Sequence, residues 1–538
     1  MRTSIILEMA EWFYNEGFWG FHVDSTKRYI ASLYIRGNYS GLVNCYLQSN
    51  TAGDQLAYTT MDVDQTQPGE WRQFCSPTFM PVMSSSDANS TFHFTFDGSQ
   101  LAGQSMYFNL LSVFKQTYKN RVNGLREDLA ESVENLKAKW IRLPGGNNME
   151  GTSSPYYWKW NETIGGLKNR PGRPGTWGDI NTDGFGLLEM LQMSQDMGLK
   201  TVLGIWAGLY LDGEVVSEQS LQHYVVSAMN ELEFLTGDAG TTYGAQRAAL
   251  GYPDPFAIDH VEIGNEDYLN DGTISYNTYR FMDFYKPILE EYPSIVAIST
   301  INPSPAGVGG SAIDLHIYEN EATFADLFNT FDQASRDFPV FVAEYAAIRP
   351  GSSTSGQVGA QTFGMACAEA IFLLGCERNS DVVVGSAYGA LIKSYNEEPG
   401  SVAVIKHMAN EILLLMSYYV QKLFAENMGS ETLPVTATDG GFGPIYWSAT
   451  ENTTSTILKL VNYGGQTGTE NAVNVTVFGS SKEEATLIVL SAPNSTSVNN
   501  LLALGGEASE VSVTTVTGSN GQFMVAFGNA FEIAILVI

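Results

Sequence analysis

The chain has 538 residues, which is more than one hydrophobic core accommodates and predicts two or three domains. It contains 28 Lys and Arg against 58 Asp and Glu, so its formal net charge at pH 7 is −30. Nucleic acids and anionic membranes bind basic surfaces, so this charge argues against both as partners, whereas a neutral polysaccharide is compatible with it. The 27 Tyr and 9 Trp would suit aromatic surfaces for sugar rings.

The cysteines and the glycosylation motifs bear on metal binding and location. Cys45, Cys75, Cys367 and Cys376 lack zinc-site spacing, so we expect no metal and no cofactor, and Cys45 and Cys75 are candidates for a bridge between neighbouring strands. Asn-x-Ser/Thr motifs favour a secreted glycoprotein, although chance also produces some. They begin at Asn38, Asn89, Asn161, Asn452, Asn474 and Asn494.

The N-terminus does not match that extracellular assignment. The apolar start of the chain is interrupted at Glu8, too early for the core of a signal peptide. We therefore expect either an intracellular protein or a chain that lacks its true start, and we favour the second. No apolar run is long enough for a membrane helix.

Three regions follow one another along the chain. Residues 15–115 are rich in short alternating runs such as 29–35, 42–47 and 91–96, which predicts an antiparallel β-sandwich. Residues 120–410 begin with a helix at 125–137 and then alternate between strands and helices, which predicts a β/α barrel. After about residue 415 we expect the helices to stop, and residues 411–538 to form a second β-sandwich.

The barrel region contains seven apolar runs of strand type. An eight-stranded barrel would need one more strand before residue 140, and the nearest run, 106–111, reads better as the last sandwich strand. We therefore expect a (β/α)8-type barrel whose first strand is missing, with all-β flanks. The seven expected strands are 140–143, 201–206, 257–264, 295–300, 312–318, 340–345 and 382–388.

Two of these strands end in carboxylates. The run 257–264 leads into Asn265 and Glu266, and the run from 340 ends in Glu344. Their separation, 344 − 266 = 78 residues, is three times 26, close to the roughly 30 residues of one β/α unit. Both side chains then lie at the barrel mouth, three strands apart. Such a pair suits glycosidic bond cleavage, with helix capping as the alternative.

Other polar and aromatic side chains are expected near the pair. Arg142 precedes a Gly-Gly turn and would hold Glu344 ionised, unless it forms a structural ion pair. Asp314, His316 and Tyr318 alternate, so they face one side of a strand, where Tyr318 would reach a carboxylate. Packing is an equal alternative for Asp314. Trp177 and Trp206 are candidates for the floor of a sugar site, although a lone Trp is more often core.

Three motifs in this order resemble the fungal type of family 51 glycoside hydrolases, the α-L-arabinofuranosidases. They are Trp140-Ile141-Arg142-Leu143-Pro144-Gly145-Gly146-Asn147-Asn148-Met149-Glu150-Gly151, Val261-Glu262-Ile263-Gly264-Asn265-Glu266-Asp267 and Val342-Ala343-Glu344-Tyr345-Ala346. The resemblance extends over nearly the whole chain from about residue 15. It implies a carbohydrate-binding-module-like N-terminal sandwich and an extracellular, exo-acting enzyme that removes arabinose from arabinoxylan, arabinan and their oligosaccharides in plant cell walls.

The resemblance also implies site roles and a retaining mechanism. Glu266 would be the acid/base and Glu344 the nucleophile, with their carboxyl groups about 5 to 5.5 Å apart. The substrate-binding residues would be Asn265, Asn147, Arg142, Tyr318, Trp177 and His316.

The chain departs from the family pattern in two places. The family's first barrel strand, which bears an acidic residue that contacts the sugar, is not found ahead of the sandwich. The family's Tyr-Ala-Pro becomes Tyr388-Gly389-Ala390, followed by an apolar helix-like run before Ser417. The alternatives that stay open are another retaining glycosidase of xylanase-like activity, and a truncated, non-catalytic homologue that binds carbohydrate.

Overall fold

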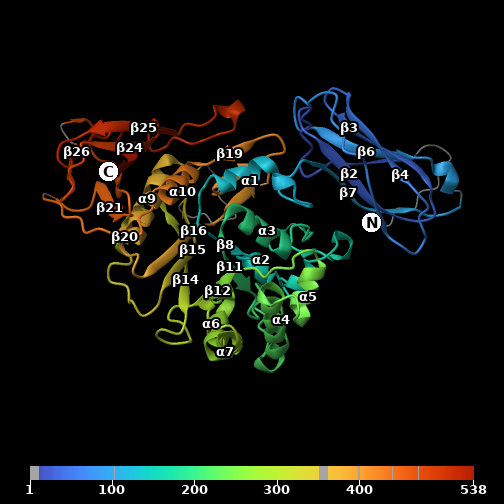
Figure 1. The fold of residues 1–538 in the computed structure, drawn as a ribbon, viewed down its shortest axis with the longest axis horizontal. Helices are drawn as coiled ribbons and strands as arrows, with labels where there is room; N and C mark the ends of the chain where they lie inside the picture. The colour runs from blue at the N-terminus through green and yellow to red at the C-terminus, as the bar shows by residue number, and fades with distance from the viewer. Residues whose placement is uncertain are drawn as a thin grey trace. The chain divides into compact units, whose positions relative to one another are not determined.

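The computed structural model describes residues 11–101, 103–178, 180–349, 361–397, 400–438, 440–469 and 472–538 (Figure 1). The N-terminal segment in which we sought a signal peptide lies outside these residues. The chain forms two compact units. The first runs to Val133 and includes Gly165–Pro171 and His407–Ile412; the second consists of Glu134–Ile164, Gly172–Lys406 and Leu413–Ile538.

The first unit contains two antiparallel sheets, of strand order β1-β6-β3-β4 and β5-β2-β7. Buried positions alternate along β3 and β4, and a core of aromatic and aliphatic side chains includes Phe92 and Phe94. Residues 107–111 of the run 106–111 form the first part of the last of these strands, which agrees with the prediction of a sandwich strand there. The strands are β1 (Glu11–Asn15), β2 (Tyr29–Arg36), β3 (Gly41–Ser49), β4 (Gln55–Val63), β5 (Arg72–Cys75), β6 (Ser90–Phe96) and β7 (Tyr107–Lys115), followed by α1 (Glu127–Glu134).

The predicted bridge between Cys45 and Cys75 is wrong, and all four cysteines are free thiols. Cys45 lies on β3 in the four-stranded sheet and is buried, whereas Cys75 ends β5 in the other sheet and is exposed. The two side chains therefore belong to different sheets and different environments. Strand order, which the local sequence does not reveal, decides this.

Seven parallel strands form the centre of the second unit, in the order β16-β15-β14-β13-β12-β11-β8. This nearly barrel-shaped sheet confirms the predicted β/α barrel between all-β regions, and each predicted strand is present within a few residues. The strands are β8 (Trp140–Leu143), β11 (Lys200–Ile205), β12 (Ile258–Ile263), β13 (Val296–Ser299), β14 (Ala312–Asn320), β15 (Val340–Ile348) and β16 (Val383–Tyr388).

Helices and short strands connect these barrel strands. The strands β16 and β8 are the first and last in the order of this sheet. Gly385 of β16 lies close to the indole of Trp140 of β8, so the bulky Trp140 side chain packs near both of these strands. The connecting elements are α2 (Asn147–Glu150), β9 (Arg173–Pro174), β10 (Ile180–Asn181), α3 (Leu187–Met197), α4 (Glu218–Thr236), α5 (Thr242–Ala249), α6 (Gly272–Ser275), α7 (Phe281–Glu291), α8 (Glu321–Asp326) and α9 (Phe363–Arg378).

The region after the barrel contains two features that the sequence did not predict. The apolar run before Ser417 forms short strands rather than a helix, and α10 follows where we expected helices to have ended. These elements are β17 (Ile392–Ser394), β18 (Ile405–His407), β19 (Ile412–Leu414) and α10 (Met416–Glu426). A short apolar run satisfies either type of structure, so periodicity alone did not decide between them.

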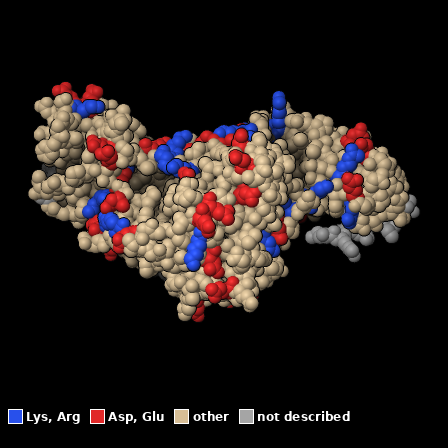
Figure 2. Space-filling view, turned by 60° about the horizontal axis from the view of Figure 1, so that its bottom comes forward, with Lys and Arg blue, Asp and Glu red and all other residues tan. Residues whose placement is uncertain are grey.

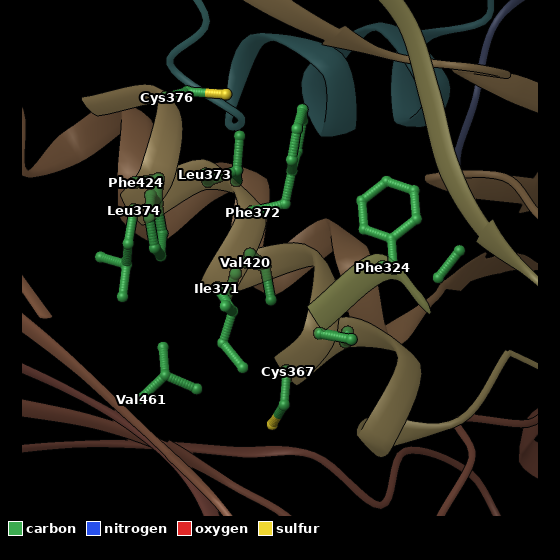
Figure 3. Packing of buried hydrophobic residues seen from close by; sticks show 14 of the residues in the cluster. Phe324, Cys367, Ile371, Phe372, Leu373, Leu374, Cys376, Val420, Phe424 and Val461 are labelled. Carbon is green, nitrogen blue, oxygen red and sulfur yellow. The ribbon is translucent and has the colours of Figure 1, made fainter. Parts of the chain in front are cut away.

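The C-terminal strands form a six-stranded sheet of order β20-β21-β22-β27-β24-β25 and a two-stranded sheet, β23-β26. Helix α9 is apolar around its whole circumference, as a helix buried on all sides must be. It packs between the barrel and this sheet, where Phe372 and Ile371 lie in the same cluster as Val461 (Figure 3). The strands are β20 (Glu431–Thr432), β21 (Ile445–Glu451), β22 (Thr456–Tyr463), β23 (Val473–Thr476), β24 (Glu484–Ser491), β25 (Glu510–Thr517), β26 (Gln522–Val525) and β27 (Phe531–Val537).

The surface agrees with the acidic composition. On the face drawn in Figure 2, acidic and basic side chains are interspersed, and no extended basic patch is visible. Within the described ranges, no helix combines the length and apolar character needed to cross a membrane.

One buried carboxyl predicts a pH-dependent stability. Glu231 on α4 is 3% exposed, its Oε1 has no hydrogen-bond partner, and burial raises its pKa to about 8. In the unfolded chain this group ionises near 4.5, so the folded state loses relative stability as the pH rises from there to about 8. Glu231→Met should therefore raise the melting temperature little at pH 4.5 and most at pH 8, where the gain corresponds to about 4 kcal/mol.

Thermal unfolding followed by circular dichroism between pH 4.5 and 8 measures this effect. Glu290→Met is the control, because Glu290 is an exposed glutamate on α7. A gain for Glu231→Met that is constant with pH would contradict the prediction.

Candidate active site

The two candidate carboxylates lie three strands apart on the barrel sheet, as the spacing predicted. Glu344 lies on β15, and Glu266 follows the end of β12. The turn after β12 requires Gly264, whose φ is +93°, because an added Cβ would lie 1.8 Å from Oδ2 of Asp267. Glu266 itself has a φ of +42°. A glycine and a left-handed residue thus direct the Glu266 side chain into the site.

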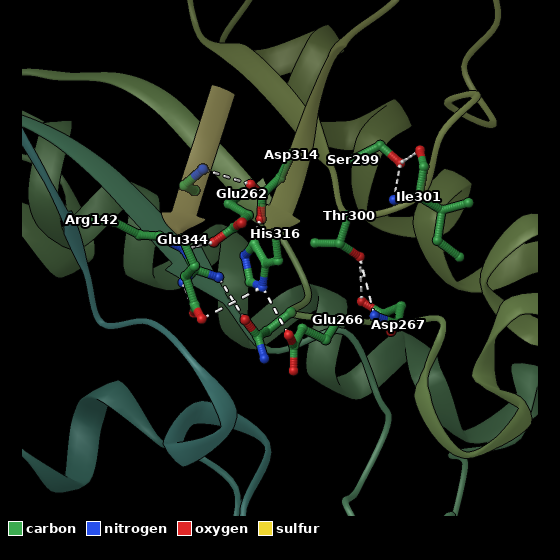
Figure 4. Close-up of polar contacts among 12 residues, drawn as sticks. Arg142, Glu262, Glu266, Asp267, Ser299, Thr300, Ile301, Asp314, His316 and Glu344 are labelled. Atoms are coloured by element: carbon green, nitrogen blue, oxygen red, sulfur yellow. Dashed lines mark hydrogen bonds and ion pairs between the residues drawn. The ribbon is translucent and has the colours of Figure 1, made fainter. Parts of the chain in front are cut away.

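Arg142 of β8 is the cation at the centre of the site (Figure 4). Its Nη1 donates to Oε1 of Glu344 at 2.7 Å, its Nη2 donates to Oδ1 of Asn265 at 2.6 Å, and its Nε donates to Glu262. The Arg142 side chain is 7% exposed, so the charge is partnered rather than solvated. It orients one catalytic candidate, Glu344, and one amide, Asn265.

Glu344 receives a second hydrogen bond from a phenol. Tyr318 Oη donates to Oε2 of Glu344 at 2.7 Å, and Gly389 lies against both side chains. A Cβ at Gly389 would lie 2.3 Å from Tyr318 Oη, so this departure from the family's Tyr-Ala-Pro leaves room for the phenol. Both oxygens of Glu344 therefore accept hydrogen bonds, which fix the orientation of the carboxyl group.

Glu266 is held by three side chains from three segments. His316 Nδ1 lies 2.9 Å from Oε1 of Glu266, Tyr268 Oη donates to the same oxygen at 3.0 Å, and Asn147 Nδ2 donates to Oε2 at 2.9 Å. His316 Nδ1 also lies 3.6 Å from Oε2 of Glu344. One imidazole therefore faces both carboxylates.

The charges of this cluster are interdependent. Burial lowers the tendency of His316 to carry charge, but Asp314, 2.7 Å from its Nε2, and Glu344 raise its pKa well above the usual range. Burial alone would raise the pKa of Glu266, but the hydrogen bond and charge of His316, with Asn147 and Tyr268, lower it to about 2. In the free site His316 is protonated and Glu266 is ionised.

The pKa of Glu262, the carboxyl group that accepts from Nε of Arg142, shifts in the opposite direction to that of Glu266. Glu262 is fully buried, and burial raises its pKa well above the usual range despite the charge of Arg142. This raised pKa favours the neutral form of Glu262, so that more of the positive charge of Arg142 acts on Glu344.

The spacing of the two catalytic candidates distinguishes two stereochemical outcomes. One oxygen each of Glu266 and Glu344, together with a nitrogen of His316, lie within 4.8 Å of one another. Inverting glycosidases separate their carboxyl groups by roughly 6.5 to 9.5 Å to admit a water, whereas retaining enzymes separate them by about 5 to 5.5 Å. The approach of one oxygen of each carboxyl to within 4.8 Å agrees with the retaining type.

The two tryptophan candidates lie in different environments. Trp206 is 6% exposed, stacks on Tyr157 at a centroid distance of 4.0 Å and donates to a backbone carbonyl, so it is a core residue. Trp177 is 58% exposed. The hydroxyl of its neighbour Thr176 donates to the Asn147 carbonyl at 3.0 Å, which holds this loop next to the site. Trp177 therefore presents an exposed indole from a loop that is tied to Asn147 through Thr176.

Some side chains of the site were missed by the sequence reasoning. Glu150 and Glu262 were seen only as letters within motifs and Tyr268 was not noted at all, yet each contacts a predicted site residue. A buried ion pair between Asp267 and Arg280 fixes the turn after Glu266. Glu262 alternates with two apolar residues on β12, and a carboxylate inside a buried strand is a signal that was available.

The chain matches two models of protein families. Residues 132–336 match the model of an α-L-arabinofuranosidase 1 domain, and residues 343–527 match that of an α-L-arabinofuranosidase C-terminal domain. A probable α-L-arabinofuranosidase A of Aspergillus terreus is 37% identical over 536 residues, which cover 97% of this chain and 81% of that protein. The α-L-arabinofuranosidase A of Aspergillus niger is also 37% identical, with the same shares.

Among solved structures, an arabinose-bound family 51 α-L-arabinofuranosidase superimposes with a TM-score of 0.88. It is 34% identical and covers 98% of this chain and 85% of its own. The chain belongs to glycoside hydrolase family 51, the α-L-arabinofuranosidases. Members of this family retain the anomeric configuration. The enzyme of Thermotoga maritima, 18% identical with a TM-score of 0.62 over 77% of this chain and 90% of its own, shares the fold.

Proposed function

We propose that the chain is an exo-acting, retaining α-L-arabinofuranosidase that removes terminal arabinofuranosyl residues from arabinoxylan, arabinan and their oligosaccharides in plant cell walls. The observation that carries the proposal is the pair of carboxylates, Glu266 after β12 and Glu344 on β15, of which one oxygen each lies within 4.8 Å of the other. The family relationship identifies the sugar as arabinofuranose.

The first step would form a covalent intermediate. Glu344 attacks the anomeric carbon, the bond to the leaving oxygen breaks, and a proton passes from Glu266 to that oxygen. Arg142 and Tyr318 support this role for Glu344, because both donate to its oxygens and hold the carboxylate in place before attack. Since His316 holds the proton in the free site, the Glu266–His316 pair rather than Glu266 alone would supply it.

The second step would release arabinose. Ionised Glu266 takes a proton from water, the water oxygen attacks the anomeric carbon, and the bond to Glu344 breaks. In the intermediate Glu344 carries no charge, which lowers the pKa of Glu266 and suits it to act as a base. The low pKa of Glu266 beside His316 supports this second role.

The substrate-binding residues proposed here surround the two carboxylates. Asn147 and Asn265 are the amides available to sugar hydroxyls, and Arg142, Tyr318 and His316 orient the carboxylates. The exposed indole of Trp177 suits a sugar ring of the substrate outside the cleaved bond.

Hydrolysis assays test this function. The chain should release the aryl alcohol from an aryl α-L-arabinofuranoside and should be at least about 100-fold less active on the aryl β-D-xyloside, because the hydroxyl and ring geometry differ. From arabinoxylan it should release free arabinose without shortening the xylan backbone, as chromatography and size exclusion would show. Backbone cleavage would instead support the xylanase-like alternative, and binding without turnover the non-catalytic one.

We further propose a division into an N-terminal carbohydrate-binding-module-like sandwich (15–115), a catalytic barrel (120–410) and a C-terminal sandwich (411–538). Tyr14, His93, Tyr46 and Tyr58 occupy one row across β1, β6, β3 and β4, with Tyr58 51% exposed. Aromatic side chains at a sheet surface suit sugar binding. Retention of a catalytically inactive variant on insoluble arabinoxylan, and its loss in the same protein with Tyr58→Ala, would test this.

An extracellular location is proposed on the glycosylation motifs. Asn38, Asn89, Asn161, Asn474 and Asn494 are exposed in the structure, and Asn452 is half-buried. Endoglycosidase treatment of protein from a secreting fungal host should lower its apparent mass. An unchanged mass would argue against an extracellular location.

A further inference from the structure

Glu150 is a buried carboxyl beside the active site that the two-step mechanism does not use. It ends the short helix α2 and is 1% exposed. Its Oε2 accepts hydrogen bonds from Nδ2 of Asn147 at 3.1 Å and from Nδ2 of Asn265 at 3.0 Å. Its Oε1 is buried and has no hydrogen-bond partner among the described residues. A single oxygen thus contacts both candidate sugar-binding amides.

These contacts decide which way each amide points. The oxygen and nitrogen ends of an asparagine have nearly the same shape, so hydrogen-bond partners alone select the orientation. Asn147 uses its second N–H for Oε2 of Glu266 at 2.9 Å, and Asn265 presents its oxygen to Nη2 of Arg142 at 2.6 Å. If either amide group were turned round, its oxygen would face Oε2 of Glu150, and two acceptor oxygens would then be in contact.

We propose that Glu150 is a positioning residue for the hydrolysis reaction: through one acceptor oxygen it directs Asn147 to donate to Glu266 and Asn265 to accept from Arg142. The proposal rests on the proposed function, since it concerns the residues assigned to that reaction. Glu150 acts through the two amides and does not itself react.

The neutral form of Glu150 fits this role. Burial, followed by the charge of Asp267, raises the pKa of Glu150 to about 8, with Glu266 adding to the rise. Its carboxyl is then protonated at neutral pH, and the proton occupies Oε1 while Oε2 accepts from both amides. Above about pH 8 its ionisation adds a negative charge next to Glu266 and Asp267.

Three variants test the proposal on an aryl α-L-arabinofuranoside. Glu150→Leu removes the acceptor and should lower kcat/KM by about 100-fold, the effect of misplacing a reacting group by roughly 1 Å. Glu150→Gln keeps one acceptor oxygen and should stay within about 5-fold of the parent at pH 6. Because Gln does not ionise, it should also remove the part of the alkaline decline that begins near pH 8.

Glu231→Leu is the matched control, because Glu231 is an equally buried carboxyl on α4, outside the site residues described above. It should leave kcat/KM unchanged, with all proteins checked for folding by circular dichroism. Full activity of Glu150→Leu, or an equal loss in Glu150→Gln, would overturn the proposal. An equal loss in Glu231→Leu would overturn it too, since the effect would then be general to the core.

Binding of L-arabinose, measured by calorimetry, separates this proposal from the proposed function. If the parent binds arabinose but hydrolyses nothing, the proposed function fails, and Glu150 is judged on binding alone. Glu150→Leu should then weaken binding about 10-fold while Glu150→Gln does not, because two amide contacts lose their orientation. Equal binding by all three proteins would overturn the role of Glu150, and no binding by the parent would overturn both proposals.

Discussion

Glu344→Gln should reduce kcat for every arabinofuranoside by about 10⁴-fold or more, whatever the leaving group. The amide keeps the size of the side chain but does not form the glycosyl bond, and it places an N–H where Arg142 Nη1 or Tyr318 Oη now donates. Steady-state hydrolysis of a dinitrophenyl and a methyl arabinofuranoside measures the loss. Glu319→Gln is the control, since Glu319 follows Tyr318 on β14 but is exposed and faces the other side.

The stereochemistry of a rescue reaction checks the assignment independently. In Glu344→Ala, azide should enter the vacated space and displace the leaving group once, so the product is the β-L-arabinofuranosyl azide with inverted configuration. Product configuration can be read by proton NMR. An α-azide from this variant would assign the nucleophile to another residue.

Glu266→Ala should show an effect that depends on the leaving group. A dinitrophenolate leaves without a proton, whereas an alcohol or sugar needs one, so kcat/KM should fall by about 10²- to 10⁴-fold for the methyl glycoside and far less for the dinitrophenyl glycoside. With the activated substrate the intermediate should accumulate, because no base activates water in the second step. A burst of dinitrophenol followed by a slow steady state is the expected time course.

Azide again separates the two carboxylates. In Glu266→Ala it should attack the intermediate on Glu344, and two successive displacements then yield the α-azide with retained configuration. The steady-state rate with the dinitrophenyl substrate should rise with azide concentration. Equal losses on both substrates, with no azide product, would contradict the acid/base role of Glu266.

How much of the site was predictable depends on whether the signal was local. Glu266 and Glu344 each follow an apolar run, and the length of β/α units predicts that they lie three strands apart, as they do in the structure. Alternation likewise placed Asp314, His316 and Tyr318 on one side of β14. The prediction of a bridge between Cys45 and Cys75 was wrong, because the local sequence does not show which sheet each strand joins.

The predictions around residue 416 were wrong for a different reason. The strands before Ser417, β18 and β19, are only three residues long, too short to show a periodicity that separates strand from helix, and α10 begins where we expected helices to have stopped. Packing against other elements determined its structure. Propensity is weak in such segments, and tertiary contacts decide them.

The sequence by itself determined the acidic character, the order of sandwich, barrel and second β region, and the strands that bring Glu266 and Glu344 to the site, because composition and periodicity are properties of neighbouring residues. The strand β15 continues past Glu344 to Ile348, which the sequence did not predict. Only the tertiary structure decided which groups share protons and hydrogen bonds. Arg142 and Glu344 are 202 positions apart, and Glu150 and Asn265 are 115 apart. Their charges and orientations depend on burial and on contacts made across the barrel, and those exist only once the chain has folded.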